Sequence, residues 1–245
     1  MQTVPGSLKG LLQQKGSTLC CDGCEGKDDS KDDAAFNGVG DVDDIPALAA
    51  LELLSFNIES LEKATTSGDN PVDSPGQDDV PKGELQVSSP AVTVNDAGSH
   101  DAVQLSVLSR RFLSKNVPPI PLRDYLLRLH KYCPMSTAVY LATSLYFTKM
   151  VTVDRLLPVD PKNKHRLVLA GLQVAMKALE DLSYPHSRVA KVGGVSQREL
   201  SRIEISFCFL ADFKLRVDAG MLLDETNAVI QKWMDCKEAG CEVTI

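Results

Sequence analysis

The residues best suited to binding a metal are three closely spaced cysteines, Cys20, Cys21 and Cys24. A structural zinc site needs four ligands, which usually come from two CxxC pairs, and here only one such pair is present. The other four cysteines, Cys133, Cys208, Cys236 and Cys241, form no matching pair. Zinc or redox use of the N-terminal cluster therefore stays a minor alternative. Cys133 and Cys208 lie among apolar residues, and we expect them to be buried thiols.

The other reactive side chains form no recognisable catalytic set. His130 and Cys133 are close in sequence, but they lie at a helix end before Pro134 with no third group to orient the base. Glu180 and Asp181 are adjacent, so on a helix they point in different directions and do not flank one bond. The run at 192–195, VGGV, lacks the lysine and the spacing of a phosphate-binding loop. We predict no enzymatic activity, no metal and no cofactor.

Charge and aromatic content divide the chain near residue 100. Residues 1–100 contain 18 Asp and Glu but 6 Lys and Arg, which gives a net charge of −12, whereas residues 101–245 carry +5. Only Phe36 and Phe56 of the 13 aromatic residues lie in the first part. A segment of this composition buries too little apolar surface to offset its chain entropy. We predict a mostly disordered acidic tail at 1–100 and a folded domain at 101–240.

The same composition excludes several classes of protein. No apolar run is long enough to cross a bilayer, and the first residues lack the apolar core of a secretory signal. The overall charge of −7 argues against a surface built for nucleic acid. We expect a protein of the nucleus and/or the cytoplasm that is not secreted and does not bind membranes.

One stretch of the acidic tail has a helical pattern. Residues 46–63 place leucine and isoleucine at helical spacing, after a possible cap at Asp44 and a proline suited to the first turn. Two interpretations stay open. The helix is transient and never docks, or it docks on the folded domain or on a partner.

The rest of the chain predicts one helix after another. Apolar residues recur at i, i+3, i+4 and i+7, and caps or prolines mark the breaks. Ser136 and Asp218 are candidate N-caps, Ser196 and Glu199 fit a capping box, and Asp160-Pro161 fits a helix start. No alternating strand pattern of useful length follows residue 101. The fold class is therefore all-α, with about seven helices. The best-defined helices are expected at 102–115, 122–132, 136–150, 160–182, 197–212 and from 218 onward.

Two charged residues stand out on very apolar helices. Lys177 lies in VAMKALED and Glu204 lies in LSRIEISFCFL. Spacing alone favours a local explanation, in which Lys177 pairs with Asp181 one turn later and Glu204 pairs with Arg202 or Arg198. Taken alone, the pattern therefore gives neither residue a functional role.

Five segments of the folded part form a recognisable series. They are PPIPLRDYLLRL at 118–129, NKHRLVLAGLQVAMKALED at 163–181, AKVGGVS at 190–196, ELSRIE at 199–204 and LADFKLRV at 210–217. Its most specific parts are the His165-Arg166 pair and the order of the later motifs. Together these segments resemble the cyclin box of the P-type and U-type cyclins, which are the fungal phosphate-pathway cyclins and their plant relatives. The likeness covers about residues 103–235.

This resemblance implies a fold and a partner. It implies a single five-helix cyclin box with a preceding N-terminal helix and an extra C-terminal helix. It further implies a non-catalytic subunit that binds and activates or directs a cyclin-dependent protein kinase. By alignment, Lys177 and Glu204 would bind the C-helix region of the kinase, and Phe213 and Leu215 would supply apolar contacts.

The chain departs from the family pattern at three places. The usual Tyr-x-Asp-Arg near the end of the second box helix is replaced by YFTK at 146–149. Ala178 stands where a bulky apolar contact residue is common, and Pro185-His186 replaces an asparagine. These changes imply weaker kinase binding or a different kinase. The alternative function is a cyclin-fold scaffold, or a nucleic-acid-associated adaptor, that binds no kinase.

Overall fold

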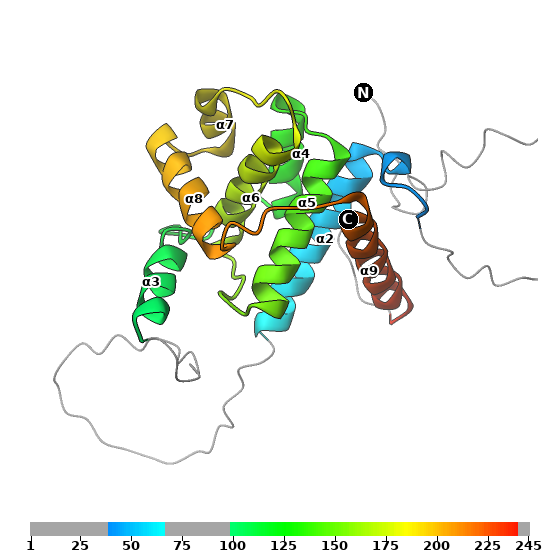
Figure 1. Cartoon of the computed structure of the whole chain (residues 1–245), viewed down its shortest axis with the longest axis horizontal. Helices are drawn as coiled ribbons and strands as arrows, with labels where there is room; N and C mark the ends of the chain where they lie inside the picture. The colour runs from blue at the N-terminus through cyan, green and yellow to red at the C-terminus, as the bar shows by residue number, and fades with distance from the viewer. Residues whose placement is uncertain (1–38, 67–98, 240–245) are drawn as a thin grey trace, which may run out of the picture.

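The computed structural model describes residues 39–66 and 99–239, and every regular element among them is helical (Figure 1). This confirms the all-α class. The elements are η1 (Val42–Asp44), α2 (Ala47–Thr66), α3 (Ser99–Arg110), α4 (Leu122–Tyr132), α5 (Thr137–Thr148), η2 (Lys149–Val153), α6 (Lys164–Leu179), α7 (His186–Gly193), α8 (Gln197–Leu210) and α9 (Ala219–Glu238).

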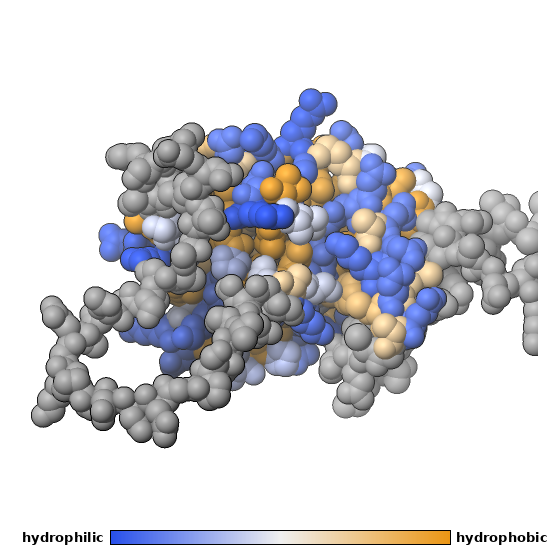
Figure 2. All heavy atoms as spheres, turned by 90° about the horizontal axis from the view of Figure 1, so that it is seen from below, coloured by the Kyte–Doolittle hydropathy of each residue, from blue (hydrophilic) through white to orange (hydrophobic). Residues whose placement is uncertain are grey.

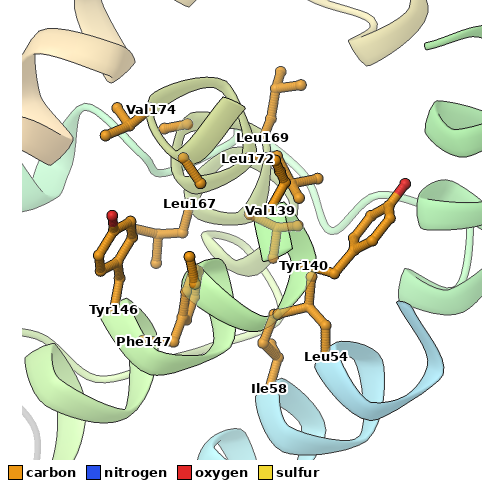
Figure 3. Packing of buried hydrophobic residues seen from close by; sticks show 14 of the residues in the cluster. Leu54, Ile58, Val139, Tyr140, Tyr146, Phe147, Leu167, Leu169, Leu172 and Val174 are labelled. Carbon is orange, nitrogen blue, oxygen red and sulfur yellow. The ribbon is translucent and has the colours of Figure 1, made fainter. Parts of the chain in front are cut away.

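Helices α5 and α6 form the centre of the fold. Helix α5 packs against α2 on one side and α6 on the other, and α6 packs in turn against α8. Figure 3 shows Leu54 and Ile58 of α2 directed toward α5, and Leu167 and Leu172 of α6 near the α5 side chains. Helix α6 is buried over most of its circumference, as its continuous apolar sequence predicts. This burial fixes the position of Lys177, which lies in the last turn of α6.

Helix α2 belongs to the main core, so the predicted domain boundary at residue 101 is wrong. Leu51, Leu54 and Ile58 are fully buried and share one apolar cluster with α5 and α6. Arg123 of α4 pairs with Glu52, and Lys164 of α6 pairs with Glu62. Of the two interpretations of the 46–63 segment, docking on the folded domain is therefore correct. The remaining parts of the predicted tail, 1–38 and 67–98, lie outside the described residues.

Capping side chains start several helices where the sequence predicts them. Ser196 and Glu199 form a reciprocal capping box at α8, and Asp218 accepts a hydrogen bond from the Met221 amide at α9. Ser136 is the N-cap residue of α5, but its side chain makes no cap bond, and its amide donates to Glu180 instead. Helix α6 begins at Lys164, four residues after Asp160, because that carboxylate holds a turn over 160–163.

A buried polar cluster joins the last helix to the centre of the fold. The Glu225 carboxylate of α9 accepts hydrogen bonds from Thr148 at 2.6 Å, Ser144 at 3.2 Å and Asn57 at 3.3 Å. These three donors come from α5 and α2, so the cluster ties three helices together. Because buried polar groups are costly without partners, the cluster also selects one register for α9.

Hydrophilic residues cover most of the described surface on the face seen from below, with apolar residues in scattered patches (Figure 2). No described helix has the combination of length and apolar character that is needed to cross a lipid bilayer.

Candidate functional site: a charged cluster beside an apolar face

Lys177 and Glu204 lie side by side, although they belong to different helices and are 27 residues apart. The Lys177 Nζ of α6 is 2.5 Å from the Glu204 Oε1 of α8. The lysine side chain is 43% exposed, and the glutamate side chain is 16% exposed. Close packing of α6 against α8 places them together. The local pairings that spacing favours are not formed. Helix α6 ends at Leu179, before Asp181, and both Glu204 oxygens contact side chains from other helices instead of Arg198 or Arg202.

His186, the first residue of α7, is the third member of the cluster. Its Nε2 lies 2.9 Å from the Glu204 Oε2, so each carboxylate oxygen of Glu204 has a nitrogen partner. Lys177, His186 and Glu204 also line one surface hollow, together with residues of the preceding loop and of α8. The position where this chain departs from the family pattern, Pro185-His186, is thus part of the site.

An apolar face continues from Glu204 along α8. Ile205 and Phe209 follow at i, i+4 spacing, and both point away from the core, with exposures of 53% and 54%. Phe213, just past the helix, is 61% exposed, and its ring makes an edge contact with Phe209 at 5.2 Å between centroids. Large exposed apolar residues gathered in one patch are typical of interaction surfaces. We call Ile205, Phe209 and Phe213, with Lys177 and Glu204, the docking face.

The turn after α8 orients Phe213. Asp212 and Phe213 both have left-handed backbone angles, with φ of 49° and 53°, which is uncommon for residues other than glycine. The Phe213 amide donates to the Cys208 carbonyl, and the Leu215 carbonyl accepts a hydrogen bond from the Tyr146 hydroxyl at 2.6 Å. Leu215 is therefore half-buried and packs against the core, whereas Phe213 projects into solvent. Strained backbone of this kind clusters at functional sites.

The five residues that the sequence analysis singled out are thus placed unequally. Lys177, Glu204 and Phe213 lie on the docking face, and Ala178, which follows Lys177, is exposed at the end of α6. Leu215 is turned inward at its edge.

Three members of the site, His186, Ile205 and Phe209, were not predicted from the sequence. The signal for the last two was present, since they are the apolar residues of α8 left over once its core stripe is assigned. Nothing comparable marks His186, whose contact with Glu204 depends on the packing of α7 against α8.

The replaced motif at the end of α5 has a structural role in this chain. Thr148, at the position of the usual aspartate, donates to Glu225 of α9. Lys149, at the position of the arginine, starts η2, a short π-helical turn, and has no ion-pair partner among the described residues. The family's acid–arginine position therefore serves here to anchor the C-terminal helix.

The cysteine and histidine groups considered above form no catalytic arrangement in the described part. His130 Nδ1 lies 2.7 Å from the Tyr140 hydroxyl, and burial raises the pKa of the Cys133 thiol, which opposes a thiolate nucleophile. Cys133 is buried as expected, but Cys208 is only half-buried. Cys20, Cys21, Cys24 and Cys241 lie outside the described residues. Among the residues that are described, no three potential ligands gather to hold a metal.

Comparison with known proteins gives one consistent family. The family model for cyclins matches residues 52–215. PHO85 cyclin-7 of Saccharomyces cerevisiae is 36% identical over 135 residues, which are 51% of this chain and 47% of that protein. The PHO85 cyclin-like protein psl1 of Schizosaccharomyces pombe is 32% identical over 178 residues, 67% of this chain and 64% of psl1. Cyclin-U4-2 of Arabidopsis thaliana is 35% identical over 100 residues.

The chain covers less than two thirds of the length of each of these relatives. The family match nevertheless begins inside α2, continues through α8 and includes all of the docking face. The resemblance drawn from the sequence motifs is thus confirmed. The chain belongs to the cyclin family, in the branch that contains the PHO85-type cyclins and the plant U-type cyclins.

Proposed function

We propose that this cyclin is a non-catalytic regulatory subunit that binds a cyclin-dependent protein kinase through the docking face. The observation that carries the proposal is the Lys177–Glu204 pair at the edge of the exposed apolar surface of α8. The names of two relatives, PHO85 cyclin-7 and PHO85 cyclin-like protein psl1, support a kinase partner of that type.

The charged pair has bonding capacity left for a partner. A lysine ammonium has three donors, and one of those of Lys177 is used by Glu204. Glu204 accepts one contact at each oxygen and retains further lone pairs. A backbone carbonyl of the partner can therefore bind Lys177, while a backbone amide binds Glu204. Hydrogen bonds to charged groups of this kind are stronger than neutral ones and require defined geometry.

The exposed aromatic residues would supply most of the affinity. Phe209 and Phe213 are large, apolar and already oriented by their contact with each other. Buried aromatic residues near the centre of an interface commonly dominate its binding energy, while charged groups at the edge set orientation. The arrangement of the docking face suits both roles.

The mechanism that this surface supports is a shift between kinase conformations. An isolated kinase of this class samples a state in which its C-helix is displaced and its active-site Lys–Glu pair is broken. A cyclin that fits only the inward position stabilises that position by differential binding. Moving the population from about 1:99 to 99:1 requires about 10⁴-fold tighter binding to the favoured state. Phosphoryl transfer itself is assigned to the kinase.

The test is capture of a purified PHO85-type kinase by the full-length chain. We expect the natural chain to bind and to raise kinase activity, and we expect the double variant Lys177→Ala/Glu204→Ala to lose both. The helical content of the variant, measured by circular dichroism, should be unchanged because the pair lies on the surface.

A matched control removes one lysine and one glutamate elsewhere. Lys232 and Glu238 are exposed on α9, away from the docking face. The double variant Lys232→Ala/Glu238→Ala should bind like the natural chain. Full binding by Lys177→Ala/Glu204→Ala would reject the site, and failure of the natural chain to bind this kinase would reject the proposed partner type.

A further inference from the structure

A second surface hollow lies between α4 and α7, and its charge is strongly one-sided. We call it the α4–α7 hollow. Four cationic residues line it, and no carboxylate does: Arg128, Lys131, Arg188 and Lys191. All four side chains belong to exposed residues, and none forms an ion pair with a described carboxylate. None of them belongs to the docking face.

The two packed helices bring these cations together. Arg128 and Lys131 are three residues apart on α4, and Arg188 and Lys191 are three residues apart on α7. Residues at i, i+3 lie on the same face of a helix, about 5–6 Å apart at Cβ, and like charges at such distances repel. Four unpaired cations around one hollow therefore create a local positive potential that an anionic ligand relieves.

Two of the four cations contact other groups of the protein. The Lys131 Nζ lies over the ring of the adjacent Tyr132, 5.6 Å from its centroid. Arg188 is held more firmly. The Arg188 guanidinium donates to the Tyr132 carbonyl from Nε at 2.9 Å and from Nη2 at 2.5 Å. It also lies over the Tyr184 ring, 5.0 Å from the centroid. This contact ties α7 to the C-terminal end of α4 and fixes the width of the hollow. The charged ends of Arg128 and Lys191 are left to meet a ligand, and Lys131, which has no carboxylate partner among the described residues, keeps its hydrogen-bond donors for one.

The floor of the hollow is apolar. Leu127 and Val192 line it and are half-buried, and Tyr132 lines it with 48% of its surface exposed. A ligand that fills the hollow therefore needs an apolar side chain as well as negative charge. Nucleic acid fits this combination less well, because it requires a row of cations that follows its phosphates.

We propose that the α4–α7 hollow is a docking site for an acidic segment of a partner protein. In an extended peptide, side chains on one face recur about every 6.6–6.8 Å, which is near the spacing of the cations on each helix. Acidic side chains of the partner contact Arg128, Lys131 and Lys191, and an apolar side chain between them packs on Leu127 and Val192. The site is separate from the docking face, so this partner and a kinase can be bound together.

The test uses two short labelled peptides and the full-length chain. One peptide has glutamates on both sides of a central leucine, and the other has glutamines in their place. Fluorescence anisotropy should show binding of the glutamate peptide, weakening as salt rises, and about ten-fold weaker binding of the glutamine peptide. No binding of the glutamate peptide, or equal binding of both, overturns the proposal.

Charge-reversal variants locate the site. Arg128→Glu/Lys191→Glu should weaken binding of the glutamate peptide about ten-fold or more, because it replaces two attractions by two repulsions. The control Lys162→Glu/Arg198→Glu changes the net charge equally at exposed positions outside the hollow, and it should bind nearly like the natural chain. If both variants lose peptide binding equally, binding depends on the overall charge of the chain and not on the hollow, and the proposal is overturned.

A further variant separates a partner from this chain's own acidic segment. Replacing Asp28, Asp29, Asp32 and Asp33 by asparagine in the full-length chain should leave peptide binding nearly unchanged. If the peptide binds only after this replacement, the chain's own segment occupies the hollow and the assignment to a partner is wrong. If the natural chain binds the glutamate peptide but does not capture the kinase, the proposed function is rejected and this inference stands.

Discussion

Arg123 of α4 binds both carboxylate oxygens of Glu52 of α2, through Nε at 2.9 Å and Nη2 at 2.7 Å. Glu52 is almost completely buried, so its charge depends on this one arginine for compensation. The hydrogen bond to Glu52 also raises the pKa of Arg123. The pair joins a helix from the acidic N-terminal part of the chain to the first helix of the cyclin box.

Removing the arginine should therefore destabilise the whole domain. We expect Arg123→Ala to lower the free energy of unfolding by about 2–3 kcal/mol, because it leaves Glu52 buried and unpaired. Urea denaturation followed by circular dichroism measures the change. Arg128→Ala removes an exposed arginine five residues later on the same helix and should change stability by less than about 0.5 kcal/mol. If Arg123→Ala loses as little stability as Arg128→Ala, the Arg123–Glu52 pair does not hold α2 in place.

Exchanging the charges of the central pair tests its role more sharply than deleting them. In the double variant Lys177→Glu/Glu204→Lys, the two side chains can still pair with each other. The loss of thermal stability should therefore be small and should come from the lost contact between Glu204 and His186. A partner's backbone carbonyl would then meet a carboxylate, and its amide would meet an ammonium. We therefore expect kinase capture to be lost. Capture that survives the exchange would mean that the pair only joins α6 to α8.

Truncating an exposed ring should separate binding from folding. We expect Phe209→Ala to weaken kinase binding about ten-fold or more. The folded state should lose only about 0.5–1.5 kcal/mol, from the edge contact with Phe213. Titration calorimetry with the purified kinase and thermal melting give the two quantities. The control Val107→Ala removes an apolar side chain of similar exposure on α3 and should change neither kinase binding nor thermal stability. If Phe209→Ala loses stability in proportion to its loss of binding, Phe209 is not a binding residue of the docking face.

A buried histidine should make stability depend on pH. Burial lowers the pKa of His165 below its usual value near 6.5, although its Nε2 contacts the Ile120 carbonyl at 2.9 Å. Between the folded and unfolded pKa values, the unfolded chain binds the proton and the folded chain does not. The stabilisation is thus present above about pH 6.5 and is lost as pH falls toward the folded pKa.

The variant His165→Gln should accordingly show a flatter dependence of melting temperature on pH between about 7 and 5. Thermal melts at several pH values measure the slope. Identical slopes for His165→Gln and the natural chain would place the titrating group elsewhere.

The polar cluster around Glu225 predicts how firmly α9 is attached. Thr148→Val keeps the side-chain volume but removes the hydroxyl that donates to Glu225 and accepts from Asn57. We expect a loss of about 1–3 kcal/mol and faster amide hydrogen exchange in α9. Thr152→Val, one turn later and exposed, should change stability by less than about 0.5 kcal/mol. Unaltered exchange in α9 would show that its apolar contacts alone hold it.

Local patterns in the sequence located most of the helices but not the elements against which they pack. The capping box of Ser196 and the capping role of Asp218 depend on neighbours within three residues, and both are confirmed. The docking of α2 depends on residues far along the chain, and average composition across 1–100 conceals it. The helix was therefore identified at the correct place, but its position in the core was left open.

In the candidate site, too, local patterns located the residues but did not identify the residues that they contact. Spacing alone paired Lys177 and Glu204 with neighbours on their own helices. Their actual contact needs the crossing of α6 and α8, which only the family resemblance implied. His186 reaches Glu204 by way of a third helix, so neither spacing nor the resemblance identified it.

The left-handed pair Asp212 and Phe213 has a consequence for the cost of association. Two successive residues in this conformation leave the chain few alternatives, because each is disfavoured by about 1–2 kcal/mol and is maintained only by its surroundings. The Phe213 ring is thus presented by a backbone that is already ordered. Less conformational entropy remains to be lost when a second protein covers it, and more of the contact energy is left to appear as affinity.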